Sequence, residues 1–304
     1  MKVAIVQADG KIPNLALMKL ASHHLNDGDE VVLGIDATVD RAYISVIWPQ
    51  NRPQALGIAK WFPDSEVIIG GTGFNYSVTL SEEIEHTTPA YDLWGIDYSM
   101  GFTSRGCIRK CPFCIVPIKE GSIKPHSPLS EFVRTGHDKV MIMDNNLLAA
   151  PNCIEVLDEL YERNLRVNFT QGLDIRLITD ELASKLARLR YRSSSFKSTY
   201  IHFAFDSLSI EPTVRRGVSI LNNAGIPSNN LVFYVLVGYD TTFDDDMHRY
   251  RVLWDELGCW PFVMNYNNGP DPQLRAFGRW VNRRLHKTIP WEEYSRNPDV
   301  LAIA

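Results

Sequence analysis

A regular alternation of strand-like and helix-like segments across residues 97–265 constrains the fold of this chain more than any other feature. Short apolar runs rich in β-forming residues recur there, and longer stretches with helical periodicity separate them. Alternation of this kind is typical of repeated βα units with parallel strands. The strand-like runs are Asp97–Thr103, Lys139–Met143, Arg166–Phe169, Tyr200–Phe205, Leu231–Val237 and Pro261–Asn265.

Residues 1–92 carry a separate and shorter α/β pattern. A β-branched run at Val3–Gln7 is followed by a helical pattern that opens at Pro13-Asn14. Another helix is expected over Pro53–Phe62. The pattern predicts a small Rossmann-like domain with a parallel sheet. Its other strand runs are Val31–Leu33, Ala42–Ile47 and Val67–Ile69.

We therefore expect an α/β protein with domains at 1–92 and 93–270 and a helical tail at 271–304. Hydrophobic residues make up 45% of the chain, which is enough for a substantial core. The net charge of −5 gives no overall basic field, although a local basic patch could still bind nucleic acid. No apolar run approaches the roughly 20 residues that span a bilayer, so we expect a cytoplasmic protein with reduced thiols and no membrane segment.

Cys107, Cys111 and Cys114 form the most specific motif, with the spacing C-x3-C-x2-C. Three thiolates leave an iron–sulfur cube one ligand short of its usual four-cysteine shell, so one iron would stay open to another ligand. A zinc site is the alternative, but it would need a fourth ligand, and the nearest candidate, His126, lies beyond a loop rich in Pro and Gly. A disulfide framework is less favoured because Cys153 and Cys259 are isolated.

The run Thr103-Ser104-Arg105-Gly106-Cys107, followed by Cys111-Pro112-Phe113-Cys114, resembles the cluster motif of the radical S-adenosylmethionine enzymes. The resemblance implies that the three cysteines hold a [4Fe–4S] cluster whose fourth iron binds S-adenosylmethionine, with Phe113 beside it. It also implies a partial (βα)6 TIM-like barrel. The implied reaction is reductive cleavage of S-adenosylmethionine to a 5′-deoxyadenosyl radical that abstracts hydrogen from a substrate, with an electron donor such as a flavodoxin or ferredoxin as partner.

Polar residues at the strand ends are the further site candidates, because the chemistry of such barrels lies at the carboxyl ends of the strands. Asp144 and Asn145 follow the second run and could accept hydrogen bonds from an ammonium group. The resemblance implies that this position holds the methionine amino group. An Asx turn that ends the strand would explain the same residues without a ligand.

The third and fourth runs end in a second group of candidates. Gln171, Asp174 and Arg176 can face the mouth of a barrel. Arg176 could bind the methionine carboxylate through two hydrogen bonds, although a salt bridge to Asp174 would account for both residues. By resemblance, Asp206 is the candidate for the ribose hydroxyls and Arg216 for a carboxylate contact.

The fifth run leads through Gly238 into a polar loop that resembles the family's adenine-binding loop. Backbone groups are expected to bind there. The sixth run, which continues to Asn268, would face the substrate.

The first domain resembles the cobalamin-binding domain that precedes the barrel in one subclass of this family. That domain carries an Asp-x-His-x-x-Gly loop after its first strand, whereas the corresponding run here is Ala8–Pro13 and has no histidine. The lower ligand of a cobalt ion would be missing. We therefore expect a degenerate, structural version of the domain, with Gly70–Gly73 as a turn, and no cobalamin.

The tail interleaves basic and aromatic residues over Leu274–Tyr294. Such a segment could bind nucleic acid. The favoured alternative is an amphipathic helix that docks Phe277, Trp280, Val281 and Leu285 on the barrel, because these residues are three to four positions apart.

Three functions from different classes stay open. They are a radical enzyme acting on a small molecule or peptide, a radical enzyme that modifies nucleic acid, and a non-catalytic iron–sulfur or zinc protein. Cys153 and Cys259 have no neighbour at ligand spacing, so we expect no second cluster and predict buried structural thiols.

Overall fold

The computed structural model describes residues 1–268 and 271–296, and it has the mixed α/β fold with parallel sheets that the sequence predicts. Two compact units divide the chain. Unit 1 comprises Met1–Phe102 and His126–Val140, and unit 2 comprises Thr103–Pro125 and the chain from Met141 onward. None of the described helices combines the length and the apolar character that crossing a bilayer requires.

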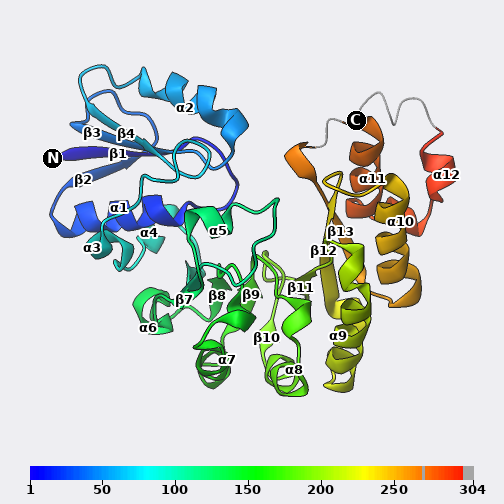
Figure 1. Ribbon diagram of the computed structural model, residues 1–304. Coiled ribbons are helices and arrows are strands. Elements are labelled where there is room, and N and C mark those ends of the chain that lie inside the picture. The colour runs from blue at the N-terminus through cyan, green and yellow to red at the C-terminus, as the bar shows by residue number, and fades with distance from the viewer. Residues whose placement is uncertain (269–270, 297–304) are drawn as a thin grey trace. The chain divides into compact units, whose positions relative to one another are not determined.

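Unit 1 begins with a four-stranded parallel sheet of order β2-β1-β3-β4. Helix α1 starts after Asn14, whose side chain accepts a hydrogen bond from the Leu17 amide and so caps the helix. Helices α1 and α2 are drawn with this sheet in blue in Figure 1. The bounds are β1 Lys2–Gln7, α1 Leu15–Asn26, β2 Glu30–Leu33, β3 Arg41–Ser45, α2 Arg52–Ala59 and β4 Glu66–Gly70.

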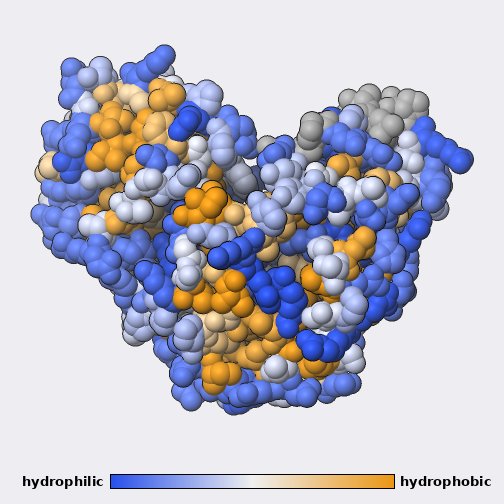
Figure 2. Space-filling model, viewed as in Figure 1, coloured by the Kyte–Doolittle hydropathy of each residue, from blue (hydrophilic) through white to orange (hydrophobic). Residues whose placement is uncertain are grey.

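The edge strand β4 is only partly covered. Val67, Ile68 and Ile69 are half-buried, and Figure 2 shows hydrophobic side chains on the surface where Figure 1 draws β3 and β4. The short elements that complete unit 1 are α3 Glu82–Glu85, α4 Tyr91–Trp94, β5 Ser99–Gly101 and α6 Leu129–Phe132.

All strand-like runs predicted between residues 97 and 265 contain a strand. Strands β5, β8, β9 and β10 form one sheet of order β10-β9-β8-β5, and β11, β12 and β13 form a parallel sheet in chain order. A single parallel bridge between Leu173 and Phe203 connects the segment after β9 to β11. The strand bounds are β8 Lys139–Ile142, β9 Arg166–Phe169, β10 Arg190–Tyr191, β11 Ile201–Ala204, β12 Leu231–Val237 and β13 Trp260–Asn265.

Helices cover one face of the sheet β11-β12-β13, as Figure 1 shows for α9, α10 and α11. Phe203 and Phe233 stack on this covered face with ring centroids 5.6 Å apart. Helix α10 is α-helical only to Arg251, and the chain continues as a π-helical turn over Val252–Glu256. The helix bounds are α7 Cys153–Glu162, α8 Asp180–Ala187, α9 Glu211–Asn223, α10 Phe243–Arg251, α11 Pro272–Asn282 and α12 Trp291–Tyr294.

The tail docks through its apolar face, as the spacing of its aromatic residues predicts. Phe277, Trp280 and Val281 of α11 are buried, and Leu285 is half-buried. Arg284, which follows the helix, is exposed and has a left-handed backbone conformation with φ 61°.

A buried ion pair lies beneath the helices of unit 2. Arg249 of α10 is fully buried, pairs with Asp246, and donates to the carbonyl oxygens of Phe205 and Leu236 at 2.8 and 2.7 Å. The guanidinium group therefore joins α10 to the ends of β11 and β12.

Candidate functional site

The cysteine loop is closed at its base by a short antiparallel pair, β6 Ser104–Arg105 with β7 Lys124–Pro125. Gly106 has φ 82°, and a Cβ atom there would lie 2.4 Å from the Ser122 carbonyl oxygen. Only glycine fits this close approach. The Cys107 amide donates to the Gly121 carbonyl at 3.2 Å, and this hydrogen bond holds the two ends of the loop together.

Asp144 anchors the segment that leads into the loop. Its carboxylate accepts hydrogen bonds from the Thr103 amide, the Thr103 hydroxyl and the Ser104 hydroxyl at 2.7, 2.7 and 2.5 Å. Burial raises the pKa of Asp144, and the hydrogen bonds from Ser104 and Thr103 oppose that rise. Asp144 thus acts within the structure as a support for the loop.

The three cysteine side chains are half-buried, and they are close enough that a charge on one raises the pKa of another. Cys107 Sγ accepts hydrogen bonds from the Arg109 amide at 3.3 Å and from Asn146 Nδ2 at 3.5 Å. Burial raises the pKa of both Cys111 and Cys114. Among the charged neighbours, Arg176 acts to lower the pKa of Cys111.

Asp174 is the electrostatic centre of the site. It binds Arg176 through two hydrogen bonds of 2.6 and 3.0 Å and also accepts from Arg109 Nε at 2.9 Å. Burial alone would raise the pKa of Asp174, but the two guanidinium groups outweigh it and hold the pKa below its ordinary value. Because Arg109 lies between the first two cysteines, Asp174 joins the cysteine loop to the end of β9.

Asn146 lies between the sulfur of Cys107 and the carboxylate of Asp174. Its Nδ2 contacts Cys107 Sγ and, at 3.4 Å, the Asp174 carboxylate. Its Oδ1 is buried and has no hydrogen-bond partner among the described residues. An unpaired buried acceptor costs free energy, so this oxygen is available for a donor that the protein itself does not supply.

Asn145 and Glu120 form a separate contact on the other side of the loop. Asn145 Nδ2 donates to Glu120 at 2.6 Å, and Glu120 also accepts from Arg105 and from the Gly106 amide, each at 3.2 Å. Asn145 therefore supports the loop rather than reaching the sulfurs directly.

Asp206 follows β11 and lies near Arg176 and the sulfurs of Cys111 and Cys114. Its Oδ1 accepts a hydrogen bond from the Leu236 amide at 3.1 Å, and burial raises its pKa. Arg216 is exposed and makes a long contact of 3.4 Å with the Arg176 carbonyl oxygen.

An aromatic chain extends from the loop to the last two strand ends. The rings of Phe113 and Tyr239 meet edge to face at 5.4 Å, and Tyr239 meets Tyr266 at 4.9 Å. Tyr239 and Tyr266 also line a cavity of about 500 Å³ together with Gly238 and Thr242.

The sequence candidates are thus brought together to different degrees. Asp174, Arg176, Asp206 and Phe113 surround the cysteine loop, and Gly238 lines the neighbouring cavity. Gln171 is exposed. Two residues that surround the sulfurs were not among the candidates: Asn146, in the same polar run as Asp144 and Asn145, and Arg109, inside the motif itself.

Within residues 1–268 and 271–296, no group of three or more His, Cys, Asp or Glu side chains is arranged to hold a single metal ion. His126 instead contacts Glu85 of unit 1 at 3.0 Å. Cys153 and Cys259 are buried, and burial raises the pKa of each to about 12, as suits inert structural thiols.

The strand ends of the first sheet are filled by the chain's own groups. The Asp9 carboxylate accepts from the amides of Ile47 and Trp48 at 2.7 and 2.9 Å. Gly71 and Gly73 approach the same loop so closely that a Cβ atom would lie 2.3 Å from the Val46 carbonyl oxygen or 2.6 Å from the Trp48 carbonyl carbon. These glycines serve internal packing, which accounts for them without a ligand.

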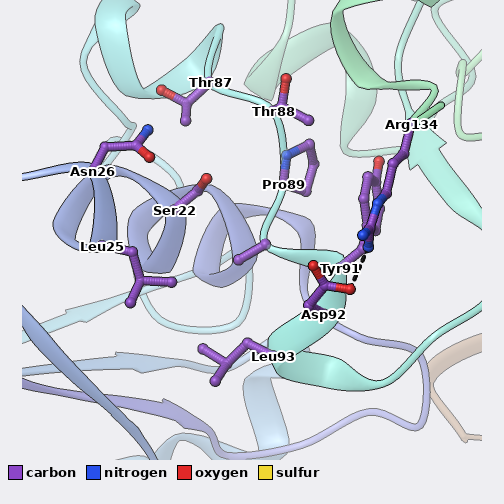
Figure 3. A pocket seen from close by; sticks show the side chains of 11 residues that line it. Ser22, Leu25, Asn26, Thr87, Thr88, Pro89, Tyr91, Asp92, Leu93 and Arg134 are labelled. Carbon is purple, nitrogen blue, oxygen red and sulfur yellow. Dashed lines mark hydrogen bonds and ion pairs between the residues drawn. The ribbon is translucent and has the colours of Figure 1, made fainter.

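A second cavity, of about 600 Å³, lies in unit 1 between the end of α1, the segment Thr87–Ala90 and Arg134 (Figure 3). The ion pair of Arg134 with Asp92 closes one side of it. Its lining has no cysteine or histidine, so the chemistry of the sulfur site has no counterpart there.

No protein-family model, curated protein or solved structure matches this chain.

Proposed function

We propose that the protein is a radical S-adenosylmethionine enzyme whose [4Fe–4S] cluster is held by Cys107, Cys111 and Cys114. The observation that carries this proposal is the unpaired Oδ1 of Asn146, buried beside Cys107 and next to the ion pair of Asp174 with Arg176. A ligand bound at the sulfurs with both an ammonium and a carboxylate group would match an orphan acceptor beside a guanidinium.

The donor set fits such a cluster better than a single zinc ion. A structural zinc site needs four ligands, and His126, the nearest candidate for the fourth, contacts Glu85 instead. Three thiolates would suffice for a [4Fe–4S] cluster whose fourth iron stays open to another ligand. Hydrogen bonds from the Arg109 amide and Asn146 to Cys107 Sγ are of the kind that tune a cluster.

The barrel belongs to the same proposal. The wall of a partial (βα)6 barrel would consist of β5, β8, β9, β11, β12 and β13. The bridge from Leu173 to Phe203 would join its two sheets. Contacts that converge on the cysteine loop come from the segments that follow β8, β9, β11 and β12.

When bound, the cluster supplies an electron that cleaves S-adenosylmethionine to methionine and a 5′-deoxyadenosyl radical. The chain's own residues would have four tasks. Asn146 would accept a hydrogen bond from the ligand's ammonium group, Arg176 would face its carboxylate, and Asp206 would accept from its ribose hydroxyls. Tyr239 and Tyr266 would cover the adenine and keep water from the site. The electron would come from a partner such as a flavodoxin or ferredoxin.

Anaerobic reconstitution with iron and sulfide tests the proposal. The wild type should bind about four irons per chain and, with dithionite and S-adenosylmethionine, release 5′-deoxyadenosine detected by mass spectrometry. Cys111→Ala should lose both the iron and the product. The matched controls are Cys153→Ala and Cys259→Ala, which remove buried thiols away from the loop and should retain both.

Two outcomes would contradict the proposal. Iron binding without 5′-deoxyadenosine would indicate a non-catalytic iron–sulfur protein. Stoichiometric binding of zinc, lost in Cys111→Ala and competing with iron, would indicate a zinc site.

A further inference from the structure

Two segments of unit 2, 182–205 and 272–291, each contain five Lys or Arg residues and no acidic residue, although the net charge of the chain is −5. The cations are Lys185, Arg188, Arg190, Arg192 and Lys197 in the first, and Arg275, Arg279, Arg283, Arg284 and Lys287 in the second.

The fold brings these two segments together although they are far apart in sequence. Arg284 donates a hydrogen bond to the Tyr200 hydroxyl at 3.0 Å. Trp260, the first residue of β13, lies beneath both Arg284 and Lys287, at 4.4 and 5.3 Å from the ring centroid. The two segments thus meet through Tyr200 and Trp260.

The loop before β12 completes the connection. Trp260 Nε1 donates to the Asn229 carbonyl at 2.9 Å, and Asn230 Nδ2 donates to the Tyr191 hydroxyl at 3.2 Å. Tyr200, Asn230 and Trp260 stand at or just before the first residues of β11, β12 and β13, and Tyr191 belongs to the two-residue strand β10. The surface therefore lies at the amino ends of the strands, whereas the cysteine site lies at their carboxyl ends.

The exposed side chains of this surface are almost all hydrogen-bond donors. In 188–199 they are Arg188, Ser194, Ser195, Lys197, Ser198 and Thr199, and in 282–288 they are Asn282, Arg283, Arg284, Lys287 and Thr288. Arginine, lysine, serine, threonine and asparagine are the side chains that contact phosphate oxygens of nucleic acids.

Two acidic residues of the neighbouring helices are paired, Asp158 with Lys185 and Glu256 with Arg215. Asp158 neutralises Lys185, which is therefore not counted as part of the surface. The exposed cations Lys197, Arg284 and Lys287 have no carboxylate partner in any contact of the described residues.

We propose that this surface, formed by 188–200 and 283–288 around Trp260, binds the phosphate backbone of a single-stranded nucleic acid. An acidic protein is a poorer match because protein interfaces centre on an apolar or aromatic core, and Phe196 and Tyr191 are buried here. A membrane surface is a poorer match because no exposed apolar side chain is available for insertion within these segments. Tyr200 and Trp260 are half-buried and keep part of their aromatic surface exposed, on which the unpaired bases of a single strand can pack, whereas the bases of a duplex are already stacked. The inference does not depend on the cluster.

Fluorescence anisotropy with labelled 20-nucleotide oligo(U) and oligo(dT), and a duplex of the same length, tests the surface. The full chain should bind the single strands with an affinity that falls as salt rises. Arg284→Asn with Lys287→Gln, and separately Arg192→Gln with Lys197→Gln, should each weaken binding about 5-fold or more at low salt. Each pair should also reduce the slope of log affinity against log salt by roughly 1.4, the value for two lost phosphate contacts.

The control is Lys11→Gln with Lys60→Gln, which removes the same charge from exposed positions of unit 1 and should leave binding unchanged. Circular dichroism establishes that each variant is folded. An equal loss of affinity in the control and the test pairs would contradict the proposed binding surface, as would the absence of oligonucleotide binding at low salt. Tighter binding of the duplex, or equal competition by polyglutamate at the same charge concentration, would overturn the assignment to single-stranded nucleic acid.

Discussion

Replacement of Asp144 by alanine should be the most informative test of how the cysteine loop is held. The substitution removes the acceptor of three buried hydrogen bonds, from the Thr103 amide and from the hydroxyls of Thr103 and Ser104. The amide cannot turn away, so leaving it unpaired costs about 2 kcal/mol, and each hydroxyl that loses a charged acceptor costs about 1 kcal/mol. The expected loss is therefore about 4 kcal/mol.

Asp144→Asn should be much milder, at about 1 kcal/mol. The asparagine oxygen can still accept from the Thr103 amide, and both hydroxyls can rotate to accept from the new amide group. The two variants therefore separate the loss of the hydrogen bonds, in Asp144→Ala, from the loss of the charge alone, in Asp144→Asn. Asp255→Ala, at an exposed position of the same unit, should change stability by less than about 0.5 kcal/mol.

Urea denaturation followed by tryptophan fluorescence measures the stability of each variant. Hydrogen–deuterium exchange with mass spectrometry localises the effect, because peptides that cover 99–125 should lose protection in Asp144→Ala and retain it in Asp144→Asn. If the alanine variant is as stable as the asparagine variant, or if exchange of these peptides does not change, Asp144 does not hold the loop.

Three further predictions concern the packing and the charges of both units. Gly71→Ala should destabilise the protein by about 3 kcal/mol in thermal unfolding, because φ is 96° and the new Cβ would meet the Val46 carbonyl oxygen, whereas Gly57→Ala, in an open helical position, should be neutral or stabilising. Arg249→Met should cost about 3–5 kcal/mol in urea denaturation because it leaves a buried carboxylate uncompensated; an equally stable variant would mean that the ion pair is dispensable. The hydrogen bond from His86 to Glu131 raises the pKa of His86, so its stabilisation is full below the unfolded pKa of about 6.5 and is lost as pH rises through the higher folded pKa. The difference in Tm between wild type and His86→Gln should accordingly shrink from pH 5.5 to pH 8.5, and a constant difference would refute the linkage.

Most strands were predictable because they carry a local signal of β-branched and aromatic residues, but the two-residue strand β10, Arg190–Tyr191, was not predicted. The pair of β6 and β7 was not, because Lys124–Pro125 has no strand propensity and pairs only where the loop closes. The π-helical turn at Val252–Glu256 was not predictable either, because apolar periodicity does not distinguish it from a continuation of the α-helix.

The candidate site shows the same limit. Local sequence identifies Asp144-Asn145-Asn146 as a polar run at a strand end, but the backbone conformation decides which side chain meets the sulfurs. Asp144 turns to Thr103 and Asn145 turns to Glu120, so Asn146 is the residue that reaches Cys107. The sequence left two options for Arg176, a contact with the methionine carboxylate or a salt bridge to Asp174. In the structure its side chain binds Asp174. A long-range contact of this kind has no signature in a single sequence.

The left-handed backbone at Arg284 adds a thermodynamic argument to the geometry of the basic surface. A residue with a side chain at φ 61° carries strain of about 1 kcal/mol that glycine or asparagine would relieve. Arg284→Gly should therefore raise the Tm while it weakens nucleic-acid binding. If the surface binds nucleic acid as proposed, an arginine at a position where glycine would relieve strain lowers the stability of the fold in favour of recognition.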